Sequence, residues 1–209
     1  LFRSGGLLAP TKTDTAAVFG FEQIQLTDTL KLQAAGRIEH HLVKGLAPSF
    51  PADFLPPPDT FTEEAGRRSF APKSVSVGVL KNLPWDMVAT LTAQRVQRAP
   101  AAPELYSRGS DDASGTFVIG NPNLTIETAQ TAEIGLRRTV GQLRFESSLY
   151  YTLYKDFIFK QVTGHFCTDT FATCGATGPL IQVAYGQRDA VFRGAELSMQ
   201  LDVTPLGDG

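Results

Sequence analysis

The sequence lacks long apolar runs and is poor in the residue types on which most catalytic and metal sites depend. No stretch approaches the roughly 18 consecutive apolar residues of a transmembrane helix. The chain holds only 3 histidines and 2 cysteines. No Ser-His-Asp set, phosphate-cradling glycine loop or catalytic carboxylate pair can be assembled from its motifs. The sequence therefore predicts neither an enzyme nor a bundle of membrane helices, and it predicts no cofactor.

Charge is also scarce and is not biased to one sign. Charged residues make up 19% of the chain and the formal net charge is -2, whereas typical soluble domains carry roughly 25% charged residues. Lysine and arginine are scattered along the chain. A nucleic-acid-binding domain would gather them into a basic stripe that neutralises phosphates. The composition therefore excludes nucleic acid as a partner.

The sequence does contain repeated alternation with a period of two residues. From Gly194 to Val203, apolar and polar residues alternate strictly. In a strand this pattern gives one apolar and one polar face, whereas a helix would mix the two sets on every side. The same pattern predicts further strands at 16–26, 30–39, 74–79, 87–94, 130–137 and 144–153.

The links between these predicted strands alternate in length. Short links lie at 27–29, 82–86, 140–142 and 204–209, and long polar links at about 44–69, 99–125 and 164–179. The first long link is rich in proline, which excludes regular strand there. A membrane barrel sorts its links in this way because all its short turns lie on one side of the membrane and its long loops on the other. We predict an all-β fold, an antiparallel up-and-down transmembrane β-barrel segment with about seven strands of a larger barrel.

Two alternatives stay open at this point. A soluble extracellular β-sheet module for binding or adhesion would show the same alternation, but it has no reason to sort its links by length. Such a module must cover its apolar face with a second layer, whereas a barrel leaves that face to lipid. An outer-membrane β-barrel enzyme is disfavoured because no nucleophile stands out in the sequence.

Four residues of the last long link are candidates for a disulfide or a metal site. Cys167 and Cys174 lie close together in a polar segment, which suits a disulfide in an oxidising compartment. His165 and Asp169 lie beside them and could join the thiolates around a metal ion. We favour the disulfide because an oxidising compartment removes free thiolates, and we predict no metal site.

Three motifs in this order resemble the TonB-dependent receptor family. Residues 98–106 (Arg-Ala-Pro, then Glu-Leu-Tyr) are similar to one stretch of these receptors. Residues 120–128 resemble their Asn-Pro-Asn-Leu-x-x-Glu-Thr segment, and 192–197 their Gly-Ala-Glu strand opening. The motif residues are Arg98, Pro100, Glu104, Leu105, Tyr106, Asn121, Pro122, Asn123, Leu124, Glu127, Gly194 and Glu196.

This resemblance implies that residues 1–209 are part of one receptor β-barrel domain, truncated at both ends. Barrels of the family usually have about 22 strands and lie in the cell outer membrane. The resemblance implies uptake of a metal ion, an iron-siderophore or a similar nutrient. The loop at 107–117 looks closest to receptors for zinc or other metals. The implied partners are outer-membrane lipid, a small nutrient ligand, and the TonB complex through an N-terminal plug that this chain lacks.

Overall fold

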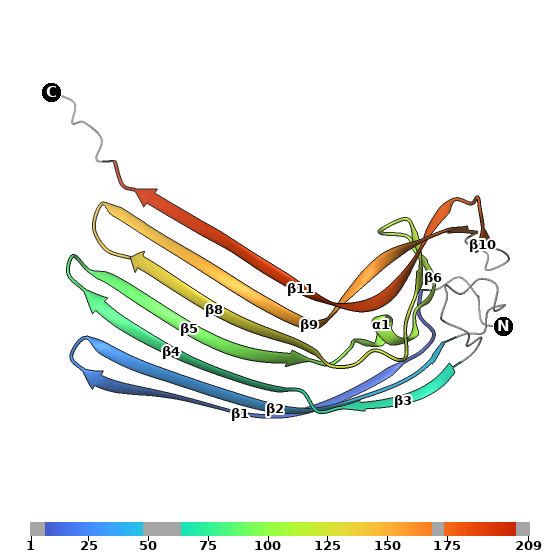
Figure 1. Cartoon of the computed structure of the whole chain (residues 1–209), viewed down its shortest axis with the longest axis horizontal. Coiled ribbons are helices and arrows are strands. Elements are labelled where there is room, and N and C mark those ends of the chain that lie inside the picture. The colour runs from blue at the N-terminus through green and yellow to red at the C-terminus, as the bar shows by residue number, and fades with distance from the viewer. Residues whose placement is uncertain (1–6, 48–63, 169–173, 204–209) are drawn as a thin grey trace.

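The computed structural model describes residues 7–47, 64–168 and 174–203. Nearly all of its regular structure belongs to one 11-stranded sheet (Figure 1). The strands are β1 (Lys12–Thr27), β2 (Leu30–Ala47), β3 (Glu64–Phe70), β4 (Lys73–Leu83), β5 (Met87–Arg98), β6 (Arg108–Asp111), β7 (Thr116–Ile119), β8 (Glu127–Arg138), β9 (Leu143–Cys167), β10 (Cys174–Gly175) and β11 (Leu180–Leu201). The single helix of the described residues, α1, spans Ala102–Tyr106.

The long strands form an antiparallel meander in the order β1-β2-β4-β5-β8-β9-β11. Each strand predicted from alternation is present, so the all-β class is confirmed. The predicted count of about seven strands differs from the structure, because short ladders add β3, β6, β7 and β10 to the sheet. No helix in the described ranges combines the length and the apolar character needed to cross a membrane.

Short and long links lie at opposite ends of the sheet. The tight turns at 28–29, 84–86 and 139–142 lie together at the left in Figure 1, an edge that we call the turn end. α1, β6 and β10 lie at the right, an edge that we call the loop end. This arrangement follows from an up-and-down meander, in which successive links alternate between the two edges.

The register of the ladders separates the residues into two faces. One row, paired strand to strand, reads Leu32, Val79, Leu91, Ile134, Leu149 and Ala195. The adjacent row on the other side reads Gln33, Gly78, Thr92, Glu133, Tyr150 and Gly194. We call these sides the apolar face and the polar face. Ile134 and Leu149 are about 60% and 61% exposed, so no second layer covers the apolar face within the described residues.

The long links are more structured than the sequence predicts. The expected link at 44–69 loses both ends to strands, because β2 continues through Ala47 and β3 begins at Glu64 and pairs with it. The expected link at 164–179 contains the end of β9 and the short β10. The link at 99–125 contains α1 and the hairpin of β6 and β7.

The main apolar core lies at the loop end and on the polar face. It is formed by Val43, Phe70, Ala99, Leu105, Tyr106, Leu124 and Ile158. In this core, Leu105, Tyr106 and Leu124 of the segment between β5 and β8 pack with Val43 of β2 and Phe70 of β3. The segment therefore folds back against the sheet instead of extending away from it.

Candidate functional site

The segment that we call loop 99–126 packs on the polar face through the ring of Tyr106. This ring lies against Gly45 of β2 and Gly66 of β3, which are directly paired in the sheet. A Cβ atom at Gly45 would lie 2.5 Å from Tyr106 Cδ2, and one at Gly66 would lie 2.5 Å from Tyr106 Oη. The two glycines thus create the space that the tyrosine ring fills, and Tyr106 is fully buried.

The other side of loop 99–126 is fixed to the last long strand. β7 pairs with β11 in parallel, from Ile181 opposite Thr116 to Ala184 opposite Ile119. β6 then pairs with β7 as an antiparallel hairpin. The loop therefore connects β2 and β3 to β11 across the polar face at the loop end (Figure 1).

Three charged residues join both ends of this loop to the sheet, and we call them the Arg98 cluster. Arg98 Nη2 lies 3.1 Å from Glu127 Oε2, and Arg98 Nη1 lies 2.8 Å from Glu104 Oε2. Glu127 Oε2 also accepts a hydrogen bond from the backbone N–H of Ile158 at 2.8 Å. Glu104 accepts one from the N–H of Ala101 at 2.7 Å, which caps α1. The cluster thus ties together the end of β5, α1, the start of β8 and β9.

The return of the loop toward β8 is held by backbone contacts around Gly120. Arg108 is buried, and its Nη1 donates to the carbonyl oxygens of Gly120 at 2.6 Å and Ser107 at 3.0 Å. The N–H of Asn121 donates to the carbonyl oxygen of Glu104 at 2.8 Å. A Cβ atom at Gly120 would lie 2.6 Å from the backbone nitrogen of Ser107, so only glycine fits this close approach.

Most residues of the predicted family motifs therefore meet in one place. Arg98, Pro100, Glu104, Leu105, Tyr106, Asn121, Pro122, Leu124 and Glu127 all lie within loop 99–126 or at its two anchors. Asn123 is exposed beside them, and its N–H donates to Asn121 Oδ1. Gly194 and Glu196 lie apart, on the polar face of β11 opposite Tyr150 and Ser148. The first group builds the fold of the loop, and its side chains are mostly turned away from open space.

The cysteine pair lies at the far tip of β9. Cys167 and Cys174 are joined by a disulfide, and they also pair directly between β9 and β10. His165 is exposed, and Asp169 lies outside the described residues. Within the described ranges no group of three or more His, Cys, Asp or Glu residues is arranged to hold a metal ion.

A row of polar residues crosses the polar face between aromatic side chains, and we call it the polar floor. In register it reads Phe21, Ala35, Ser76, Gln94, Thr131, Thr152 and Phe192. Beside its first half lies a depression of about 330 Å³ whose lining includes Phe19, Phe21 and Arg37. The floor thus offers hydroxyl and amide groups flanked by rings.

An aromatic trio closes the other end of the polar floor. The ring centroids of Tyr154, Phe157 and Phe192 are 5.0 to 5.4 Å apart, mostly edge to face. Phe192 remains about 45% exposed. The sequence motifs do not single out this trio, because Phe192 comes from β11 and the other two rings from β9. The available signal was that Tyr154 and Phe192 fall on the polar phase of their strands.

A cation lies between the hairpin and β11. Lys160 Nζ is 3.5 Å from Asp111 Oδ2 and 5.6 Å from the centre of the Tyr185 ring. A hydrogen bond from the Ser114 hydroxyl, together with the charge of Lys160, holds the pKa of the Asp111 carboxyl below its usual value. This side of loop 99–126 therefore presents charge and an aromatic ring together.

The family model "TonB dependent receptor-like, beta-barrel" matches residues 4–208 of this chain. Among solved structures, a copper transporter, OprC, matches with a TM-score of 0.69 and 15% identity over 93% of this chain and 27% of its own. The hemophore receptor HasR of Serratia marcescens, in complex with its hemophore HasA and heme, matches with a TM-score of 0.67 and 17% identity, over 97% of this chain and 34% of its own.

The chain therefore spans about a third or less of the length of the solved structures that it matches. The family match covers nearly all of the chain, and the two structures share the fold of its sheet. The two faces are thereby assigned, since lipid contacts the apolar side of such a wall and the lumen lies on the polar side. The chain belongs to the TonB-dependent receptor-like β-barrel family, and its sheet is a section of an outer-membrane barrel wall.

Proposed function

We propose that the parent protein is an outer-membrane receptor that takes up a metal bound to an organic chelator. The proposal rests on the polar floor, which lies on the lumen side and ends at the aromatic trio. Aromatic rings and scattered hydroxyl and amide groups suit a large organic ligand, because the rings contact its apolar surface and the polar groups orient it. In this proposal the Arg98 cluster acts indirectly, by holding loop 99–126 beside the floor.

The metal-ligating side chains of the described residues favour a chelated metal over a bare ion. Bare Zn²⁺ or Cu²⁺ requires several His, Cys or carboxylate ligands that converge on one point. The described residues contain no such group. We therefore do not base the proposal on a metal site at His165 and Asp169. Similarity in fold to a copper transporter and to a hemophore receptor supports uptake of a metal in some form.

The remaining parts of the proposal concern the parent chain. Residues 1–209 would form part of one barrel domain that continues beyond both ends. Uptake would draw energy from the TonB complex through a plug outside this segment, and the small ligand would enter past loop 99–126. No soluble binding module is proposed, because the apolar face is uncovered in the described residues and the family is one of membrane barrels.

The test is ligand binding by the purified full-length parent. The probes are haem, a ferric tris-catecholate, and Zn²⁺ and Cu²⁺ alone, each titrated with and without Phe192→Ala. We expect one of the two chelates to bind and Phe192→Ala to weaken it by roughly 3- to 10-fold, since loss of one ring contact is worth about 0.5–1.5 kcal/mol. The control is Leu149→Ala, which removes a similar area from the apolar face.

Either of two results would overturn this function. One is tight binding of the bare ions with no binding of either chelate. The other is equal weakening by Phe192→Ala and Leu149→Ala, which would place the ligand away from the polar floor. If neither result is obtained, loss of chelate uptake in cells that lack the parent gene distinguishes transport from binding alone.

A further inference from the structure

Loop 99–126 brings the two ends of the strand order together. This order begins at β1 and ends at β7 and β6, which belong to the loop. The backbone N–H of Arg108 in β6 donates a hydrogen bond of 3.0 Å to the carbonyl oxygen of Leu7, shortly before β1. Figure 1 shows β6 beside the chain that leads into β1. The loop therefore crosses the polar face from the last long strand back to the first.

The end of the loop that returns to β8 is fixed by the side chain of Gln187 on β11. Gln187 Oε1 accepts a hydrogen bond from the N–H of Thr125 at 2.9 Å, and its Nε2 donates to the carbonyl oxygen of Thr125 at 3.0 Å. The same Nε2 donates to the carbonyl oxygen of Asp156 on β9 at 2.9 Å. Gln187 thus takes the place of a strand partner for Thr125 and ties it to both β9 and β11.

The hairpin of β6 and β7 packs on the disulfide. Phe117 and Ile119 of β7 form a buried cluster with Cys167 and with Ala184 of β11. Gln182 pairs with Phe117, is fully buried, and donates to Cys167 Sγ at 3.4 Å. The parallel ladder between β7 and β11 is short, and this cluster supports it from one side. The middle of the loop is therefore held as firmly as its two ends.

This degree of burial is the opposite of what a moving lid requires. Lids and other segments that open locally have few buried apolar contacts, and they turn on hinge residues that are free to change their backbone angles. Five apolar side chains of the loop are each at most 1% exposed, namely Leu105, Tyr106, Phe117, Ile119 and Leu124. Gly120 is enclosed by backbone and cannot serve as a hinge. A continuous exposed stretch of the loop lies at the hairpin tip, at 112–115.

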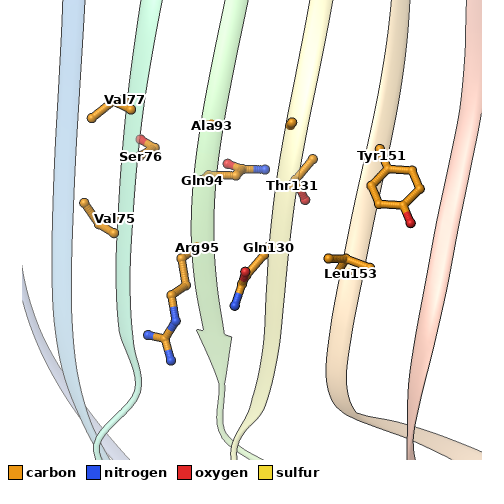
Figure 2. Close-up of a pocket in the computed structure, with 11 residues that line it drawn as sticks. Val75, Ser76, Val77, Ala93, Gln94, Arg95, Gln130, Thr131, Tyr151 and Leu153 are labelled. Atoms are coloured by element: carbon orange, nitrogen blue, oxygen red, sulfur yellow. The ribbon is translucent and has the colours of Figure 1, made fainter.

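We propose that loop 99–126 stays closed throughout transport and acts as a fixed bar across the outer part of the lumen. This inference rests on the proposed function, because it concerns how the ligand reaches the polar floor. Ser76, Gln94 and Thr131 of the floor follow one another across β4, β5 and β8 (Figure 2), on the turn-end side of the loop. A chelate therefore passes around the loop and not through its opening, so that a fixed gap limits the size of the ligand.

The first test is amide hydrogen exchange of the full-length parent in detergent, measured by mass spectrometry of its peptides. We expect peptides from 104–109 and 116–124 to exchange within about 10-fold of the rate of β8, because they would open only together with the barrel wall. Haem or a ferric tris-catecholate should leave these rates unchanged. Faster exchange than this limit, or acceleration by either chelate, would overturn the proposal. The rates without a chelate test the loop even if the proposed function is wrong.

The second test locks the loop to the wall during uptake. Val118 of β7 and Val183 of β11 pair directly and are both buried. Val118 points away from Cys167, because its neighbours Phe117 and Ile119 contact that cysteine and side chains alternate along a strand. We expect cells with Val118→Cys and Val183→Cys together to take up the chelate as fast as cells with either single variant.

Peptide mass spectrometry without a reductant shows whether the new link between positions 118 and 183 has formed, and faster gel migration before boiling than after shows that the barrel is folded. Loss of uptake in the linked double variant alone, with chelate binding unchanged, would show that the loop must open and would overturn the proposal. Failure of the parent to bind any chelate would instead contradict the proposed function, and hydrogen exchange would then decide whether the loop is fixed.

Discussion

Arg98, the last residue of β5, and Glu127, the first residue of β8, lie directly opposite each other and share two hydrogen bonds. Arg98 Nε lies 3.3 Å from Glu127 Oε1, and Nη2 lies 3.1 Å from Oε2. This paired geometry fixes both carboxylate oxygens at once. Because loop 99–126 begins and ends at these two residues, their contact closes the loop at its base.

Arg98→Ala should loosen loop 99–126 without unfolding the barrel. The pair is partly exposed, so its contribution is smaller than that of a buried ion pair, about 1–2 kcal/mol to the local stability of the loop. We expect protease cleavage within 99–126 to accelerate roughly 5- to 30-fold. Cleavage can be followed by mass spectrometry of the full-length parent in detergent.

The control for this variant is Arg144→Ala, which removes an ion pair to Asp202 near the turn end. It should leave cleavage of loop 99–126 unchanged. If both variants accelerate cleavage equally, the effect belongs to the barrel as a whole and the anchoring role of the Arg98 cluster is wrong.

Gly120→Ala should be more damaging to the loop than its size suggests. The added Cβ would lie 2.6 to 2.7 Å from backbone atoms of Ser107, Leu105 and Tyr106, and backbone cannot rotate away as a side chain can. Forced overpacking of this kind costs about 1–3 kcal/mol. Gly175→Ala is a suitable control, because open space surrounds that position. The measurement is the rate of protease cleavage within loop 99–126. Equal rates for Gly120→Ala and Gly175→Ala would contradict the close approach at Gly120.

The disulfide between Cys167 and Cys174 should be present in the exported protein. Alkylation of the denatured protein followed by peptide mass spectrometry should leave Cys167 and Cys174 unlabelled without a reductant and label both after reduction. A link over so few residues should stabilise the tip of β9 by about 2–3 kcal/mol, largely by restricting the unfolded chain. Free thiols in protein recovered from the outer membrane would contradict this pairing.

A charge introduced on the apolar face should be far more damaging than the same charge on the neighbouring residue. Ile134→Arg places a guanidinium on the lipid side of β8 and should cost about 2–4 kcal/mol. Glu133→Arg places it on the polar side of the same strand and should have a small effect. Urea titration of the folded, heat-modifiable band measures both. A larger loss for Glu133→Arg would reverse the assignment of the two faces.

Alternation predicts the middle of the barrel strands but not their outer extensions. β9 and β11 extend much farther toward the loop end than the alternation predicts. Their ladder contains a bulge, at which the register shifts between Arg188 and Ala190 and Asp156 has a positive φ of 57°. Each bulge changes which residues face the lumen, so the period-two signal ends there although the hydrogen-bonded ladder continues. β3 was missed because it follows a proline-rich segment and is only 7 residues long.

The role of the motif residues could not be predicted from spacing. Arg98 and Glu127 are separated by 29 positions, and their contact depends on the register of β5 with β8. α1, β6 and β7 have only 4 or 5 residues each and are formed by tertiary contacts instead of local propensity. The aromatic trio could not be predicted either, because its contacts depend on the pairing of β9 with β11.

Every proposal for this chain depends on the assignment of one face to lipid and the other to the lumen. The most direct test places single spin labels along β8 at positions 130–137 of the full-length parent in lipid bilayers. Labels at 132, 134 and 136 should collide with lipid-soluble oxygen, and labels at 131, 133 and 135 should not. A profile without this two-residue period, or with its phase reversed, would contradict the barrel wall described for this protein.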